Sequence, residues 1–159
     1  MTRVGTGFDI HRLAPGRDLV LCGVRFDSPV GAVGHSDGDV PVHALIDALL
    51  GAAAMGDIGA RFPDTDPEWE GADSLEMLRI VRDELAQAGW KTVNADITVI
   101  AERPKIRDAA REMRENVARA LGCDASLVSV KGKTMEKIGA VGSGTAIAAQ
   151  AAALIEKCN

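Results

Sequence analysis

One stretch of the sequence, from His35 to Gly59, combines a helical apolar pattern with side chains that bind metals. It holds two histidines and four aspartates. Acids and imidazoles are seldom buried unless they are paired or bind a ligand. Five small or apolar residues recur there at helical spacing and predict a helix with a buried face: Ala44, Leu45, Ala48, Leu49 and Ala52. The stretch therefore predicts a metal site beside a buried helix.

The remaining ligands are predicted at Asp9 and His11, near the start of the chain. These residues are two positions apart in a segment that reads as a strand, so their side chains point the same way. The helix is predicted to begin after Asp37 or Asp39, with Pro41 in its first turn. That start places His43 near its beginning. Taken alone, Asp9 and His11 fit a solvated turn at a strand end better than a metal site.

Together, Asp9, His11 and His43 would give three protein ligands and leave one position open, the pattern of catalytic rather than structural zinc. Oxygen and imidazole ligands suit zinc, with manganese or iron as alternatives. Asp47 follows His43 by four residues and is the predicted orienting group for its ring. An ordinary helical His–Asp surface pair explains Asp47 nearly as well.

Composition limits the class of protein. A chain of 159 residues suggests one domain, residues 1–159, and a net charge of −5 argues against a nucleic-acid binder. Three widely spaced cysteines favour free thiols in a reducing compartment. There is no signal-peptide pattern and no apolar run that could span a bilayer, so the expected location is the cytoplasm.

The rest of the chain alternates strands and helices. Gly23 separates the two strands of a predicted hairpin, whereas Gly31 and Gly34 predict a flexible or tightly turned segment. Thr145–Lys157 is ambiguous, because its alanines favour a helix and a sheet that lacks a partner favours a strand. The other predicted elements are a loop at residues 61–67, a helix capped by Asp73-Ser74, a strand at 93–101, a helix at 106–121 ended by Gly122, a strand at 128–131 and a loop at 132–137.

Several ordered motifs resemble the 2-C-methyl-D-erythritol 2,4-cyclodiphosphate synthase family of the non-mevalonate isoprenoid pathway, over nearly the whole chain. The motifs are Gly5-Thr6-Gly7-Phe8-Asp9-Ile10-His11, His35-Ser36-Asp37-Gly38-Asp39, Gly56-Asp57-Ile58-Gly59, Phe62-Pro63-Asp64-Thr65-Asp66-Pro67, Ala101-Glu102-Arg103-Pro104-Lys105 and Lys131-Gly132-Lys133-Thr134-Met135-Glu136-Lys137.

The resemblance implies an α/β domain of the α+β type. Its mostly four-stranded sheet would be covered on one side by helices, with a short hairpin in addition and a strand for the final segment. The family is a homotrimer with active sites between subunits. If the protein comes from a plant or an alga, its mature form would act in the plastid stroma.

The implied reaction is the cyclisation of 4-diphosphocytidyl-2-C-methyl-D-erythritol 2-phosphate with release of CMP. The 2-phosphate of the substrate attacks the β-phosphorus, so the enzyme mainly positions and neutralises two anions. By resemblance, Asp9, His11 and His43 hold Zn²⁺ (or Mn²⁺), and Glu136 holds Mg²⁺ (or Mn²⁺) together with the substrate phosphates.

The resemblance also assigns roles to further residues. His35 and Thr134 correspond to positions that stabilise the transition state. The implied substrate contacts are Ser36, Asp57, Ile58, Gly59, Phe62, Pro63, Asp64, Thr65 and Asp66, with Phe62–Asp66 as a mobile cover. The implied nucleotide contacts are Ala101, Glu102, Arg103, Pro104, Lys105, Ile106, Arg107, Lys133, Thr134 and Met135.

The chain departs from the family near its C-terminus. Many members have an aromatic residue and a Gly-x-Arg-Gly-Glu pattern where this chain has Ala140 and Gly142-Ser143-Gly144-Thr145. In the family that arginine lies beside an axial cavity that holds isoprenoid diphosphates. With Ser143 in its place, we expect weak or absent binding of such anions.

Two other classes of function remain as alternatives. A zinc-dependent phosphodiesterase would use a metal-bound water as the nucleophile and release an acyclic product. A non-catalytic trimer that binds a nucleotide or an isoprenoid would release no CMP. The second alternative gives no account of a three-ligand site with an open position.

Overall fold

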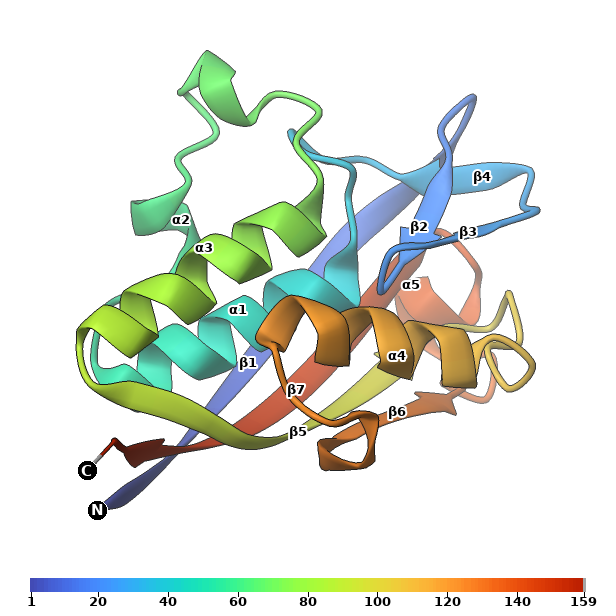
Figure 1. Cartoon of the computed structure of the whole chain (residues 1–159). Coiled ribbons are helices and arrows are strands. Elements are labelled where there is room, and N and C mark those ends of the chain that lie inside the picture. The colour runs from blue at the N-terminus through green and yellow to red at the C-terminus, as the bar shows by residue number, and fades with distance from the viewer. Residues whose placement is uncertain (159) are drawn as a thin grey trace.

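The computed structural model describes residues 1–158 and contains a five-stranded mixed sheet with helices on one face (Figure 1). The strand order is β4-β1-β7-β5-β6, and only β5 and β6 are paired in parallel. The strands of this sheet are β1 (Thr2–Pro15), β4 (Val30–Ala32), β5 (Trp90–Ile100), β6 (Val128–Lys133) and β7 (Ala146–Lys157). A separate hairpin pairs β2 (Leu19–Leu21) with β3 (Val24–Phe26), as the sequence predicted.

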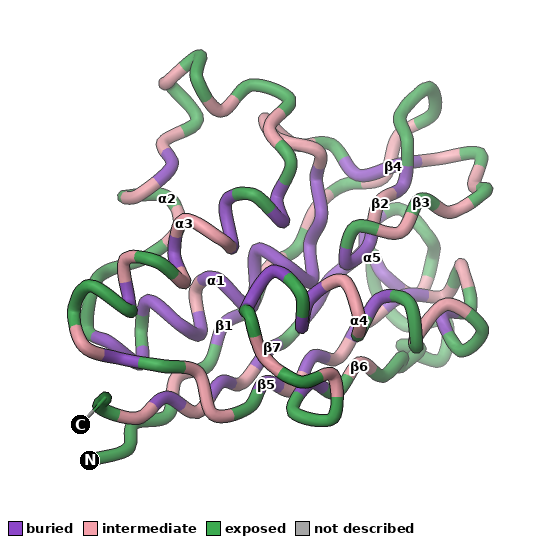
Figure 2. The backbone as a smooth tube through the Cα atoms, viewed as in Figure 1, coloured by how far each residue is buried: buried purple, intermediate pink, exposed green. Residues whose placement is uncertain are grey.

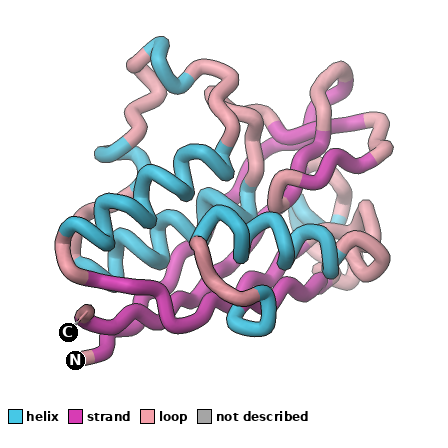
Figure 3. The backbone as a smooth tube through the Cα atoms, in the orientation of Figure 1, coloured by secondary structure: helices cyan, strands magenta, loops and turns pink. Residues whose placement is uncertain are grey.

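Three long helices cover one face of the sheet: α1 (Val40–Ala53), α3 (Ser74–Gln87) and α4 (Ala110–Leu121). The short elements are α2 (Ile58–Arg61), α5 (Gly139–Gly142) and two 3₁₀ helices, η1 (Pro67–Trp69) and η2 (Ala125–Leu127), as Figure 3 shows. The buried residues concentrate between this helical layer and the sheet (Figure 2). None of the helices in the described part of the chain is long and apolar enough to cross a membrane.

The final segment is the strand β7, so the strand expectation is confirmed over the helix propensity of its alanines. β7 lies between β1 and β5 and is antiparallel to both. Its buried residues include Ala149, Ala151 and Ala153, whose small side chains leave room for the helices above. A central position with a hydrogen-bonded neighbour on each side overrides local propensity.

The sheet has one strand more than predicted. Gly31, which the sequence analysis placed in a turn, is the middle residue of β4, and β4 pairs antiparallel with the end of β1. A side chain at Gly31 would place a Cβ 2.1 Å from the carbonyl oxygen of Asp18. The glycine therefore permits close backbone packing rather than a turn.

The third predicted helix begins later than expected, at Ala110 rather than Ile106. Ile106 lies in the turn before the helix and is buried against β6, where a Cβ on Gly132 would be 2.9 Å from Ile106 Cγ1. Ile106 is therefore part of the core, as predicted, but it is not part of the helix. Gly122 ends α4 in the left-handed conformation, with a φ of 68°.

Helix α1 lies directly on β1 because two glycines of the strand have no side chains. A Cβ on Gly5 would be 2.0 Å from the carbonyl oxygen of Ala48, and one on Gly7 would be 1.9 Å from that of Ala44. Small residues on both elements thus allow backbone-to-backbone contact. This contact fixes where the metal-binding side chains of the strand meet the helix.

Candidate metal centre and adjoining pockets

The alternation of β1 brings Asp9 and His11 to the face that Gly5 and Gly7 present to α1. On the helix, His43 immediately precedes Ala44, the residue that contacts Gly7. Asp39 caps α1 by accepting a hydrogen bond from the Val42 N–H, which fixes the first turn that carries His43. The predicted start of this helix is confirmed.

The three predicted ligands converge in the structure. Asp9 Oδ2 lies 2.9 Å from His11 Nε2 and 3.1 Å from His43 Nδ1, and one ligand atom from each residue lies within 4.8 Å of the other two. The ring centroids of the two histidines are 5.4 Å apart. One carboxylate oxygen and two imidazole nitrogens in this arrangement fit a divalent metal with an open coordination position.

The charges in this cluster support one another. Burial by itself would raise the pKa of Asp9, but the hydrogen bonds to His11 and His43 hold it well below its usual value. The same hydrogen bond to Asp9 raises the pKa of His11. Asp9 is therefore an anion at neutral pH and is ready to share a cation with two imidazoles.

Each histidine is also oriented through its other ring nitrogen. His11 Nδ1 lies 2.7 Å from the carbonyl oxygen of Val33, and Gly34 leaves space for the ring, because a Cβ there would be 3.0 Å from His11 Cε1. His43 Nε2 lies 2.8 Å from Ser74 Oγ and 3.1 Å from Ser36 Oγ. Ring nitrogens of metal ligands commonly have such partners.

The prediction that Asp47 orients His43 is wrong. Asp47 Oδ1 accepts a hydrogen bond from the Ile58 N–H at 2.8 Å, so its carboxylate holds the start of α2 instead. Both nitrogens of the His43 ring are occupied by other partners, Asp9 at Nδ1 and the hydroxyl of Ser74 at Nε2. The i,i+4 spacing could not reveal Ser74, which is 31 residues away in the chain.

A pocket of about 330 Å³ surrounds the three ligands. Trp69 and Met77 also line this pocket, and the sequence analysis missed both. Trp69 packs its ring edge against Phe62 at a centroid distance of 4.8 Å. The only signal for Trp69 in the sequence was an aromatic side chain in a polar loop. The predicted residues among the lining are His35, Ser36, Ile58, Gly59, Phe62 and Asp64.

The other predicted substrate residues lie around this pocket without lining it. Asp57 caps α2 through a bond from the Ala60 N–H at 2.8 Å. The carbonyl oxygen of Asp66 lies 3.1 Å from His35 Nε2. This contact joins the segment between α2 and α3 to His35. Pro63 and Thr65 are part of that same segment and are not among the lining residues.

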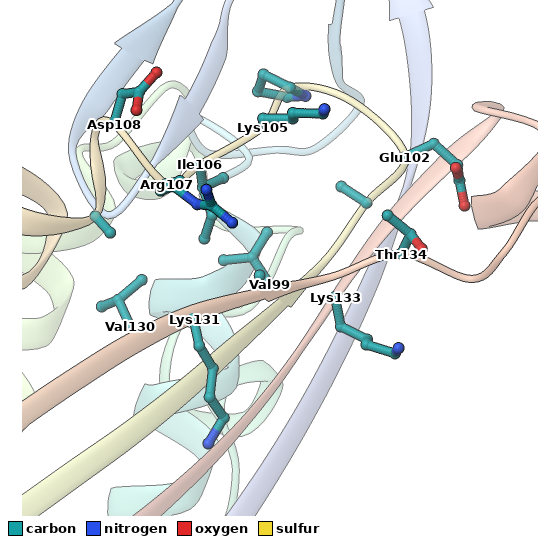
Figure 4. Close-up of a pocket in the computed structure, with 14 residues that line it drawn as sticks. Val99, Glu102, Lys105, Ile106, Arg107, Asp108, Val130, Lys131, Lys133 and Thr134 are labelled. Atoms are coloured by element: carbon teal, nitrogen blue, oxygen red, sulfur yellow. The ribbon is translucent and has the colours of Figure 1, made fainter.

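A second pocket, of about 610 Å³, lies beyond the carboxyl ends of the parallel strands β5 and β6 (Figure 4). Such ends are the usual position of ligand sites on parallel strands. The predicted nucleotide residues that line it are Ala101, Glu102, Pro104, Lys105, Ile106, Arg107, Lys133 and Thr134. Arg103 and Met135 belong to the same two loops but do not line the pocket.

The loop after β6 is held by a carboxylate. Glu102 Oε1 accepts hydrogen bonds from the Met135 N–H at 3.0 Å and the Lys137 N–H at 3.2 Å. Two residues of the loop, Glu136 and Lys137, have positive φ values of 50° and 65°. Thr134 Oγ1 donates to Glu136 Oε1 at 2.9 Å. This geometry holds Glu136 beside Thr134, which lines the second pocket.

Ser143 lies in the turn that leads from α5 to β7. Its Oγ donates to the carbonyl oxygen of Ala140 at 3.0 Å and lies 3.1 Å from Thr145 Oγ1. The side chain is thus used within its own turn and supplies no positive charge.

The sequence profile of the YgbB family matches residues 2–156. The chain belongs to this family. It is 55% identical over 152 residues to the 2-C-methyl-D-erythritol 2,4-cyclodiphosphate synthase of Symbiobacterium thermophilum, with 96% of this chain and 97% of that protein covered. It is 51% identical to the protein of the same name from Solibacter usitatus, with 98% of each chain covered.

Solved structures agree with this membership. The chain resembles the bifunctional IspDF of Campylobacter jejuni with a TM-score of 0.96 and 38% identity, and it covers 43% of that longer protein. It resembles a CDP complex of IspF from Plasmodium falciparum with a TM-score of 0.87 and 36% identity, over 99% of this chain and 97% of that one. Both structures thus share the fold over nearly the whole of this chain.

Proposed function

We propose that the chain converts 4-diphosphocytidyl-2-C-methyl-D-erythritol 2-phosphate to 2-C-methyl-D-erythritol 2,4-cyclodiphosphate and releases CMP. The observation that carries this proposal is the convergence of Asp9, His11 and His43 in a pocket of a chain whose full-length relatives are synthases of that name. The reaction joins two phosphates that repel each other, so the protein must hold and neutralise anions.

Asp9, His11 and His43 would hold Zn²⁺, or Mn²⁺ in its place, with one carboxylate oxygen and two imidazole nitrogens. When bound, the ion would polarise a phosphate oxygen as a Lewis acid. Glu136 would hold Mg²⁺, or Mn²⁺, together with the diphosphate, since magnesium needs few protein ligands. The exposed position of Glu136 beside the second pocket supports this role.

The remaining side chains would position the substrate. His35 and Ser36 line the metal pocket and can donate hydrogen bonds to the phosphate oxygens that gain charge. Thr134 would do the same from the second pocket. Asp57, Ile58 and Gly59 would contact the methylerythritol hydroxyls, and the segment from Phe62 to Asp66 would cover the site and exclude water.

The second pocket would take the cytidine diphosphate moiety. Lys105, Arg107 and Lys133 line it, so it offers positive charge for phosphates (Figure 4). Buried apolar side chains such as Val99 and Ile106 give a surface on which a base can lie. The relative from Plasmodium falciparum carries CDP, which supports the same ligand class here.

We propose a homotrimer with active sites between subunits. The outer face of β1 exposes Val4, Phe8 and Ile10 by 69%, 58% and 51%, on the side of the sheet opposite the helices. An exposed apolar patch on a sheet usually marks an interface. The metal pocket and the nucleotide pocket share no lining residue, which supports a substrate that reaches from one subunit to a neighbour.

The deciding experiment incubates the purified protein with the cytidyl substrate, Zn²⁺ and Mg²⁺ and follows the products by phosphorus NMR. We expect CMP and a cyclic diphosphate in equal amounts. The same incubation in ¹⁸O-labelled water separates hydrolysis from cyclisation. An acyclic product that contains solvent oxygen would instead establish a phosphodiesterase, and binding without CMP release would establish a non-catalytic protein.

A further inference from the structure

The ring of His43 is held by a side-chain relay that extends beyond the contact with Ser74 described above. His43 Nε2 lies 2.8 Å from Ser74 Oγ, and Ser74 is fully buried as the first residue of α3. Ser74 in turn contacts Asp37, in the loop before α1. The relay therefore joins a ligand on α1 to two residues from separate elements.

The direction of each hydrogen bond in the relay follows from Asp37. An ionised carboxylate only accepts, and Asp37 accepts twice from Ser74: from its N–H at Oδ2, at 3.1 Å, and from its O–H at Oδ1. The single proton of the Ser74 hydroxyl is therefore used by Asp37. Ser74 Oγ, the nearer of the two hydroxyls at this nitrogen, presents a lone pair to His43, so His43 Nε2 donates to it, and Ser36 Oγ at 3.1 Å can accept a share of the same bond.

This direction determines the tautomer of His43. In the neutral ring that a metal requires, the proton is on Nε2 and the lone pair is on Nδ1. Nδ1 is the nitrogen that faces Asp9 Oδ2, at 3.1 Å. In the metal-bound protein Nδ1 would therefore face the ion with its lone pair, and Asp9, the partner of Nδ1 in this structure, would share the same ion.

His11 reaches the same result by another route. Its Nδ1 lies 2.7 Å from the carbonyl oxygen of Val33, which accepts only, so a metal-bound neutral ring would keep its proton on Nδ1 and offer its Nε2 lone pair to the ion shared with Asp9. The backbone orients one ligand and a side-chain relay orients the other. Only the second can be altered by substitution.

We infer that Ser74 and Asp37 are positioning residues for the metal centre, which fix the tautomer of His43 and so set metal affinity. The inference rests on the metal site of the proposed function. Outer partners of metal-bound histidines commonly change affinity about 10- to 100-fold. The relay also receives support from the backbone, since the Asp37 N–H donates to the Ala72 carbonyl at 3.1 Å and keeps the two segments together.

The sharpest test is Asp37→Asn, which has nearly the same shape. An amide can accept from the Ser74 N–H with its oxygen and donate to Ser74 Oγ with its nitrogen. The Ser74 hydroxyl would then donate to His43 Nε2, and the neutral ring would move its proton to Nδ1. We expect Zn²⁺ to bind about 10- to 100-fold more weakly, in a competition titration against a chelator. Ser74→Ala, which removes the acceptor, should weaken binding over the same range.

The second measurement follows the ring proton itself, as the ¹H–¹⁵N signal of His43 Nε2–H in the protein loaded with Zn²⁺. We expect a slowly exchanging Nε2–H signal in the natural sequence and a faster-exchanging or missing one in Asp37→Asn, where Ser74 Oγ no longer turns its lone pair toward the ring. Asp73→Asn is the matched control, because it makes the same charge change beside Ser74 at a cap position that asparagine fills well. Circular dichroism checks that each variant folds.

The outcomes separate the two proposals. If the natural protein binds Zn²⁺ and Asp37→Asn binds it equally well with an unchanged Nε2–H signal, the relay has no role and the inference is overturned. A weaker affinity in Asp37→Asn with no change in that signal also overturns it, because the loss then has another cause. If the natural protein itself binds no Zn²⁺, the metal site of the proposed function fails.

Discussion

The backbone of Gly7 in β1 lies against the carbonyl of Ala44 in α1, so closely that a Cβ on Gly7 would be 1.9 Å from that oxygen. His43 is the residue before Ala44, and Asp9 is the next residue after Gly7 on the same face of the strand. The contact between the glycine and the alanine therefore sets the distance between two metal ligands.

Replacing Gly7 by alanine should push α1 away from β1. We expect Gly7→Ala to lower the free energy of unfolding by about 3 kcal/mol or more and to weaken Zn²⁺ binding, because overpacking cannot be relieved where backbone meets backbone. Urea unfolding and a chelator titration measure the two effects. Gly51→Ala is the control, since Gly51 is helical and a Cβ added to it would have open space within 4 Å. It should stabilise the protein by about 0.5–1 kcal/mol. Equal stability of Gly7→Ala and the natural protein would contradict the packing described.

His43→Ala and Glu136→Ala should separate the roles of the two proposed metal sites. The first removes a ligand atom of the three-residue cluster, so we expect loss of bound zinc and of CMP release. The second leaves that cluster intact, so we expect unchanged zinc content with little or no turnover. Metal analysis of the purified variants measures their zinc content, and a CMP assay measures their turnover. Normal zinc content and normal CMP release in His43→Ala would remove the ligand assignment.

Glu102 should act on the proposed Mg²⁺ site at Glu136 through the loop that it holds. Glu102→Ala removes the acceptor for the Met135 and Lys137 N–H groups, and the loss of two such bonds to a charged group should raise the Mg²⁺ concentration for half-maximal activity about tenfold. Glu102→Gln keeps an oxygen that can accept both bonds and should remain close to the natural protein.

Hydrogen exchange gives an independent reading of the same loop. The Met135 and Lys137 amides should exchange faster in Glu102→Ala and not in Glu102→Gln. Glu115→Ala serves as the control, because Glu115 is a surface partner of Arg111 on α4. A Glu102→Ala variant with unchanged exchange and unchanged Mg²⁺ dependence would show that the loop holds its shape without this carboxylate.

The outer face of the sheet should govern assembly. Phe8→Asp places a charge on the most central of the exposed apolar residues of β1, and we expect sedimentation to shift from trimer to monomer at micromolar concentrations. CMP release should fall with the trimer, because in the proposed assembly the two pockets of one site come from different subunits. Leu127→Asp changes an exposed leucine of η2, away from the β1 positions, and should leave both properties unchanged. A fully active monomeric Phe8→Asp variant would refute the shared site.

Ser143 should keep the protein from binding large anions at the threefold axis of the proposed trimer. Its hydroxyl is bonded to Ala140 and offers no cation, so farnesyl diphosphate should give no thermal shift at concentrations that stabilise a Ser143→Arg variant. Isoprenoid diphosphate that copurifies with the natural protein would contradict this expectation.

The sequence by itself determined the ligand types and the elements that carry them. Strand alternation put Asp9 and His11 on one face, Asp39 and Pro41 set the start of α1, and glycines marked where the backbones approach. These are short-range consequences of geometry and capping, which neighbouring residues specify. Long ordered motifs added the reaction by resemblance.

The tertiary structure alone decided which residues support those ligands. Ser74 reaches His43 across 31 positions, Glu102 reaches Lys137 across 35, and Gly31 joins a strand that no local pattern predicted. Asp47, the neighbour that helical spacing favoured, bonds to Ile58 instead. Orienting hydrogen bonds of this kind depend on which segments pack together, and packing is settled by the whole buried core rather than by any single stretch of chain.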